Sequence, residues 1–179
     1  PPCTELSPAG HAIEYAIEEP PKAAALVVFI MGLGNPRTLF ERQRQHFAGT
    51  YAILSVDLRG VGSSASPPGI WRMADFATDI LHVIDRAAPR WRSSAIHLVG
   101  HSMGGQICYE GAHLAPPGRV ASVAMISSVG CAFHRCSRPV LTLRPGGICR
   151  TISLLLACDV RDMLDANLQR VRILVLTSH

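Results

Sequence analysis

The chain has 179 residues, a net charge of +4, and a composition that is 48% hydrophobic and 17% charged. It is long enough for one globular domain with a buried core, and too apolar for a disordered segment. The basic residues, all arginine except Lys22, lack the interleaved aromatic residues of a nucleic-acid surface, and no apolar run is long enough to span a membrane.

The six cysteines include neither a C-x-x-C pair nor the cysteine–histidine spacing of a zinc site. This number and spacing of cysteines predict a reduced, cytoplasmic protein without a bound metal. Cys108 falls inside a helical segment and is expected to be an ordinary buried thiol.

The first half of the chain alternates predicted strands and helices. We expect strands over residues 11–17, 24–30 and 51–56, the first of them antiparallel, and helices over residues 38–47 and 73–86. Residues 24–30 form a continuous apolar run, which is typical of a central parallel strand. The helix 73–86 carries three acidic residues that we expect on its solvated face, namely Asp75, Asp79 and Asp85.

The second half continues the alternation, with a less regular stretch near its end. The expected elements are a strand over 95–99, a helix over 106–114, a strand over 120–126, a cap-like excursion over 129–158, a short helix over 161–167 and a last strand over 170–176. The order fits right-handed βαβ crossovers in an open, mostly parallel α/β sheet with helices on both faces. Such a sheet places its ligand site at the carboxyl ends of the strands, where residues 31–35, 57–64, 102 and 127–128 fall.

A turn between a strand and a helix carries the strongest chemical signal. Residues 100–105 read Gly-His-Ser-Met-Gly-Gly, which contains the pattern G-x-S-x-G. Between a buried strand and a helix, this pattern predicts a tight nucleophile elbow that exposes Ser102 at the carboxyl end of the sheet. The alternative is a glycine-rich turn in which Ser102 only caps the helix.

Three motifs together resemble those of the α/β-hydrolase fold family. Residues 100–105 match the nucleophile elbow, and residues 57–64 match a D-x-R-G-x-G-x-S turn. Residues 31–34, Met-Gly-Leu-Gly, are similar to the oxyanion loop, with Met31 where histidine is more usual. The motifs occur in the family's order and span residues 26–128.

The resemblance implies a role for several residues. Ser102 would be the nucleophile, and the backbone amides of Leu33 and Met103 would bind the oxyanion. Asp57 and Arg59 are expected to organise their turn rather than to act in catalysis. The positions that would keep the motifs in shape are Gly32, Gly34, Asp57, Arg59, Gly60, Gly100 and Gly104. No metal or organic cofactor is implied.

The rest of the family's triad has no obvious counterpart. The family's order is serine, then an acid, then histidine, but residues 127–130 hold no carboxylate and the chain reaches His179 directly after its last strand. The resemblance therefore implies a single, incomplete α/β-hydrolase domain over residues 1–179, without its C-terminal strand and helix. The catalytic acid and base would lie beyond residue 179. His134 and His179 are the substitute bases that we consider; His97, His101 and His113 are less suitably placed.

Two functions follow from this resemblance. The first is a serine hydrolase that cleaves an ester or related acyl bond of a small molecule. The second is an inactive α/β-hydrolase-like domain that only binds, or a fragment of a longer enzyme. The sequence predicts small-molecule binding rather than nucleic-acid or membrane binding, and predicts no particular oligomeric state.

Overall fold

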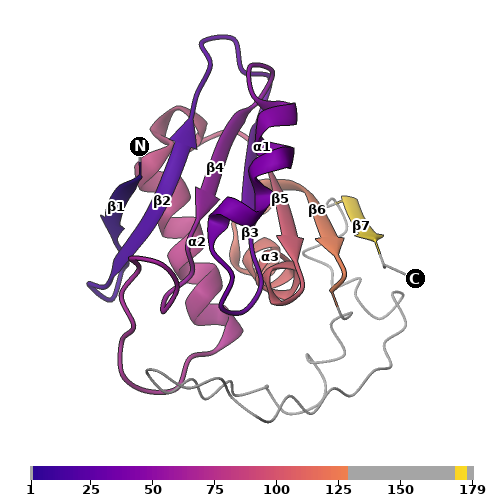
Figure 1. Cartoon of the computed structure of the whole chain (residues 1–179). Helices are drawn as coiled ribbons and strands as arrows, with labels where there is room; N and C mark the ends of the chain where they lie inside the picture. Colours follow the sequence, from indigo (N-terminus) through magenta and orange to yellow (C-terminus); the bar gives the residue numbers. More distant parts are fainter. Residues whose placement is uncertain (1, 129–171, 177–179) are drawn as a thin grey trace.

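The computed structural model describes residues 2–128 and 172–176. Their strands form a seven-stranded sheet in the order β1-β2-β4-β3-β5-β6-β7 (Figure 1). The strands are β1 (Cys3–Leu6), β2 (Ala12–Glu18), β3 (Leu26–Ile30), β4 (Ala52–Val56), β5 (Ile96–His101), β6 (Val120–Ile126) and β7 (Arg172–Leu176). The pairs β1–β2 and β2–β4 are antiparallel and all the others are parallel, which confirms the predicted open, mostly parallel sheet.

The helices lie close to the positions that the sequence pattern predicts. They are η1 (Arg37–Phe40), α1 (Glu41–Phe47), α2 (Met73–Ala87), η2 (Pro89–Trp91) and α3 (Met103–Leu114), where η marks a 3-10 helix. α3 begins three residues earlier than the predicted helix, directly after Ser102. β1 is an additional strand that the sequence analysis does not predict, and its residues are mostly exposed.

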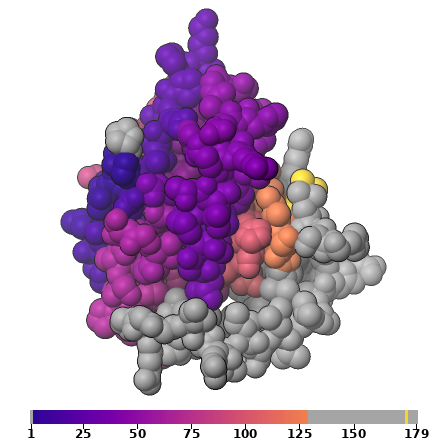
Figure 2. All heavy atoms as spheres, viewed as in Figure 1, coloured from indigo at the N-terminus to yellow at the C-terminus, as the bar shows by residue number. Residues whose placement is uncertain are grey.

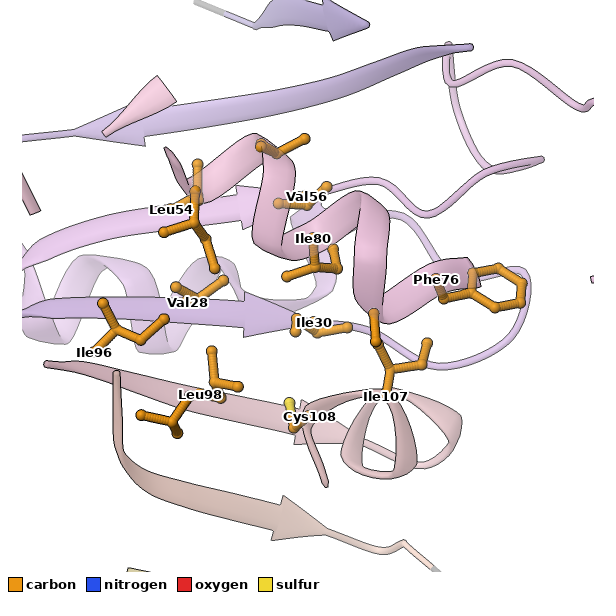
Figure 3. Close-up of a cluster of buried hydrophobic side chains, with 14 of the residues drawn as sticks. Val28, Ile30, Leu54, Val56, Phe76, Ile80, Ile96, Leu98, Ile107 and Cys108 are labelled. Atoms are coloured by element: carbon orange, nitrogen blue, oxygen red, sulfur yellow. The ribbon is translucent and has the colours of Figure 1, made fainter. Parts of the chain in front are cut away.

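One face of the sheet packs against α2 and α3. Alternate residues of the central strands point to this side, because side chains of a strand alternate between the two faces. Figure 3 shows Val28, Ile30, Leu54 and Leu98 directed toward Phe76 and Ile80 of α2 and toward Ile107 and Cys108 of α3. These side chains are all buried, so the main core fixes α3 against the sheet.

The opposite face packs against η1 and α1 over a smaller cluster. Phe29 of β3 lies between Phe40, with ring centroids 4.8 Å apart, and Phe47, at 6.4 Å. In Figure 2 the η1–α1 segment (purple) lies at the front of this view, with residues of β5, α3 and β6 (pink to orange) beside it. Val99 and Ile126 also pack against this cluster but are only partly buried.

Two predicted elements and the predicted cellular location are not tested by the structure. The predicted excursion over 129–158 and the short helix over 161–167 lie outside the described residues. None of the helices in the described part of the chain is long and apolar enough to cross a membrane. The cytoplasmic location stays a prediction.

Candidate active site

Ser102 occupies a strained turn between the end of β5 and the start of α3. Its backbone dihedrals are φ 54° and ψ −124°, and the residue is exposed. A positive φ in a residue other than glycine costs about 1–3 kcal/mol and persists only where the surrounding structure imposes it. Ser102 therefore lies in a strained turn that is held in place by the surrounding strand and helix.

Two glycines allow the turn to close. A Cβ atom at Gly100 would lie 2.3 Å from the backbone carbon of Gly104, and one at Gly104 would lie 2.2 Å from the carbonyl oxygen of Ile30. Both contacts are with backbone atoms, which cannot rotate away as a side chain can. Any larger residue at either position would push α3 away from β3 and β5.

Backbone hydrogen bonds hold Ser102 from both sides. Its N–H donates to the carbonyl oxygen of Ile126 at 2.9 Å, and its own carbonyl oxygen accepts from the N–H of Gly105 at 3.0 Å. The Ser102 side chain makes no capping hydrogen bond to α3. Ser102 is therefore the N-cap residue of α3 by position, but its side chain does not cap the helix.

Ser128 is a supporting residue to which the sequence analysis assigns no role. Its hydroxyl donates to the carbonyl oxygen of Ser102 at 2.6 Å, and it is buried at the carboxyl end of β6. A Cβ atom at Gly105 would lie only 2.0 Å from the Ser128 Oγ, so the second glycine after Met103 is needed for this contact. The only signal in the sequence is the position of Ser128 at the end of a neighbouring strand.

The glycine loop after β3 lies directly against the elbow. A Cβ atom at Gly32 would lie 2.9 Å from the Cβ and 3.4 Å from the Oγ of Ser102. No backbone carbonyl in the described part of the chain accepts a hydrogen bond from the Leu33 N–H. Gly34 has φ 70°, which lets the loop turn back immediately after Leu33.

Asp57 binds Arg37, the residue that directly follows this loop and begins η1. It is 1% exposed, and its carboxylate accepts hydrogen bonds from the Arg37 backbone N–H at 2.6 Å and from the Arg37 guanidinium at 2.5 Å. Gly62, with φ 57°, lets its own turn pass close to this carboxylate: a Cβ there would lie 2.7 Å from Asp57 Oδ2. Asp57 therefore connects its own turn to the glycine loop.

Arg59 faces a different partner from Asp57. Its guanidinium pairs with Asp79 of α2 at 2.7 Å and also lies over the ring of Phe76, 5.6 Å from the ring centroid. Gly60 approaches Trp71 on the same side, where a Cβ would lie 2.9 Å from the indole ring. Arg59 and Gly60 thus anchor the turn to α2 and the segment before it.

The expectation that Asp79 lies on the solvated face of α2 is wrong. Asp79 is 3% exposed, because α2 turns this position toward the Asp57–Ser64 turn and Arg59 supplies the opposite charge. Burial raises the pKa of Asp79, and the neighbouring guanidinium opposes that effect. Its partner lies 20 residues earlier in the chain, so periodicity within the helix cannot reveal the pair.

The described histidines do not bind the Ser102 hydroxyl. His97 is hydrogen-bonded to the Ser122 Oγ at 2.8 Å, and the Nδ1 of His101 is buried without a hydrogen-bond partner. Within residues 2–128, no side chain forms a hydrogen bond with the Oγ of Ser102. His134 and His179 lie outside the described residues.

The site contains no evident metal centre in the part of the chain that the structure describes. No group of three or more histidine, cysteine or acidic residues is close enough there to hold an ion. Cys108 lies on the core side of α3, where complete burial raises the pKa of its thiol. It is therefore the buried core thiol that the sequence predicts.

Comparison with known families agrees with this geometry. Residues 25–148 match the family model described as alpha/beta hydrolase fold, and the chain belongs to that family. It is 34% identical over 107 residues to the dihydrolipoyllysine-residue acetyltransferase component of the acetoin cleaving system from Cupriavidus necator. It is 32% identical over 120 residues to the putative carbamate hydrolase RutD from Variovorax paradoxus.

These matches cover only part of each relative. The two alignments span 60% and 65% of this chain, but only 27% and 42% of the relatives' own lengths. Among solved structures, a thermophilic esterase from Thermogutta terrifontis superposes with a TM-score of 0.60 at 25% identity. That superposition covers 72% of this chain and 46% of the esterase.

Proposed function

We propose that this protein is a serine hydrolase that cleaves an ester or related acyl bond of a small molecule, with Ser102 as the nucleophile. The observation that carries the proposal is the strained, exposed Ser102 with the Gly32 loop in contact with it. A strained backbone in a non-glycine residue is typical of functional sites. Within residues 2–128, no hydrogen bond ties the Ser102 side chain to the rest of the fold.

The proposed chemistry is acyl transfer in two steps. The Ser102 Oγ attacks the carbonyl carbon and loses its proton to a base, and the carbonyl oxygen becomes an oxyanion. The N–H groups of Leu33 and Met103 donate hydrogen bonds to that oxygen. Met103 is suited to this because it begins α3, and the first amides of a helix have no intrahelical acceptor.

When the tetrahedral intermediate collapses, the base returns its proton to the leaving oxygen, so that the alcohol departs and an acyl group stays on Ser102. Attack by water on this acyl-enzyme then releases the acid and restores the free serine. Neither step needs a metal or an organic cofactor. Within residues 2–128, no histidine or acidic side chain is hydrogen-bonded to the Ser102 hydroxyl.

The proposed class of substrate is inferred from the activities for which two similar proteins are named. A carbamate hydrolase and an esterase both act on carbonyl groups that carry an oxygen or nitrogen leaving group. The nucleophile and both oxyanion donors proposed here suit any such carbonyl, since they contact only the reacting group. We therefore propose the bond class and leave the acyl and leaving groups open.

Steady-state hydrolysis of p-nitrophenyl acetate by the full-length protein tests this proposal. We expect turnover that is lost in Ser102→Ala, because no other hydroxyl occupies the elbow. Ser63→Ala is the matched control, since Ser63 is an exposed serine in another loop at the same end of the sheet. Equal rates in wild type and Ser102→Ala would contradict the proposal.

A binding role without catalysis is the second candidate. It is favoured by one observation, the lack of a hydrogen-bonded base at Ser102 in the described part of the chain. A protein of this kind would bind p-nitrophenyl esters without releasing nitrophenol above the rate of the Ser102→Ala variant. The same assay therefore separates the two functions.

A further inference from the structure

The loop that contacts Ser102 is tied to the rest of the protein at two places. On the amino side it continues directly from β3, the central strand of the sheet. On the carboxyl side, the described backbone bonds of residues 31–36 stay within the loop and η1, from Asn35 to Gly32 and from Leu39 to Pro36. The first bond to another part of the fold is made by Arg37.

Arg37 is held by two carboxylates. Asp57 accepts from both its backbone N–H and its guanidinium, at 2.6 and 2.5 Å. Glu14 of β2 forms an ion pair with the same guanidinium nitrogen, with its Oε1 2.8 Å away. The side chains of Arg37 and Glu14 are 14% and 13% exposed and that of Asp57 is 1% exposed, so solvent screens these charge-assisted bonds little.

The carboxylates are themselves fixed to the sheet. The Ser64 hydroxyl donates to the carbonyl oxygen of Asp57 at 2.7 Å and accepts from the N–H of Glu14 at 2.8 Å. The N–H of Asp57 in turn donates to the carbonyl oxygen of Glu14 at 2.9 Å. Through Glu14 and Asp57, Arg37 is therefore attached to β2 and to the residue that follows β4.

We propose that Asp57 and Arg37 are positioning residues for the reaction: their bond fixes the end of the Gly32–Pro36 loop, so that the Leu33 N–H stays in place for the oxyanion. This inference rests on the proposed function. The physical reason is that oxyanion donors stabilise charge only when they are held in the correct position before the reaction begins. A misplacement of about 1 Å reduces the rate by about 100-fold.

A neighbouring pair provides the matched control. Arg59 and Asp79 form a second buried ion pair from the same turn, but they connect it to α2 instead of to the glycine loop. Both pairs contribute to folding. Only loss of the Asp57–Arg37 pair is expected to weaken stabilisation of the transition state and so to lower kcat.

The experiment measures kcat and KM for p-nitrophenyl acetate, thermal unfolding, and inhibition by an alkylboronic acid, using the full-length protein. The boronic acid forms an anionic tetrahedral adduct with a reactive serine, so its affinity reports on the oxyanion donors. In Asp57→Asn we expect kcat to fall about 100-fold with KM changed less than about threefold, and the boronic acid to bind about 100-fold more weakly. Asp79→Asn should unfold at a lower temperature with kcat within about threefold of wild type.

Changes at Arg37 provide a second test if Asp57→Asn does not fold. Arg37→Lys keeps a cation between Asp57 and Glu14, whereas Arg37→Met removes it, so the lysine variant should retain more of kcat. An unchanged kcat and boronic acid affinity in folded Asp57→Asn, or equal kcat in Arg37→Lys and Arg37→Met, would overturn the inference. Failure of the proposed function would look different, because wild type and Ser102→Ala would then hydrolyse the ester equally.

Discussion

The contact between Gly32 and Ser102 makes a strong prediction about a single methyl group. In Gly32→Ala the new Cβ would lie 2.9 Å from the Ser102 Cβ and 3.1 Å from the carbonyl oxygen of His101. Ordinary carbon–carbon contacts are about 3.5–4.0 Å, so the loop has to move by about 0.5–1 Å. Neither neighbouring atom can give way, because one belongs to the strained Ser102 and the other to the backbone.

The expected cost falls on activity more than on stability. A shift of about 1 Å reduces the rate by about 100-fold, and complete loss of one oxyanion donor costs about 10²–10³-fold in kcat, or about 2.7–4 kcal/mol of transition-state stabilisation. Gly32 has no positive φ, so alanine adds no backbone strain of its own there. We therefore expect kcat for p-nitrophenyl acetate to fall at least about 100-fold in a protein that still unfolds cooperatively.

Gly118→Ala is the control for this experiment. Gly118 has φ 81°, and no atom lies within 4 Å of the position that a Cβ would take there. An alanine at this position would therefore have a strained backbone but no steric clash. It should cost about 1–2 kcal/mol of stability and leave kcat unchanged. Wild-type kcat in Gly32→Ala would refute the reasoning, because it would mean that the loop does not need its close approach to Ser102.

Two further predictions concern stability, and a third concerns the reactivity of a buried thiol. Asp79→Ala leaves Arg59 buried without its partner and should lower the free energy of unfolding by about 3–5 kcal/mol in urea titrations; a loss below about 1 kcal/mol would contradict a buried pair. Hydrogen bonds from Arg44 and Gln45 lower the pKa of Glu41 from 4.5 to about 2, so this group contributes stability above pH 4.5 that is lost as the pH falls toward about 2. Glu41→Gln should therefore flatten the fall in melting temperature over that window, slightly and less so in high salt because the site is exposed; an unchanged slope at low salt would argue against the interaction. Because burial raises the pKa of the Cys108 thiol, it should remain unalkylated by iodoacetamide in the native protein and react on unfolding, as mapped by mass spectrometry; rapid native alkylation would contradict the core packing.

The parts of the fold that follow from the sequence are those encoded by local patterns. β3 is a continuous apolar run and is buried at every residue, as the pattern predicts. α2 buries Phe76, Ile80 and Ile84, which recur in the sequence at helical spacing. The tight turn at Ser102 follows only in part from its motif: Gly100 approaches Gly104 within the motif, whereas Gly104 approaches the carbonyl oxygen of Ile30 in β3, a strand distant in sequence.

The parts that do not follow are contacts between distant segments. β1 has four mostly exposed residues and no alternation, so only its pairing with β2 makes it a strand. The burial of Asp79 depends on Arg59, and the attachment of the glycine loop depends on Asp57 reaching Arg37. Each pair spans 20 residues, a separation at which periodicity carries no information.

The central claim, that Ser102 is the nucleophile, is tested most directly by locating a covalent probe on the chain. A fluorophosphonate reacts with an activated serine, and trypsin releases the elbow in one peptide, residues 93–119, which contains Ser93, Ser94 and Ser102. After labelling of the folded, full-length protein, fragmentation of this peptide in a mass spectrometer identifies the modified residue. We predict the adduct on Ser102 and no labelling of the Ser102→Ala variant. An adduct on any other serine, or equal labelling of the variant, would contradict the account.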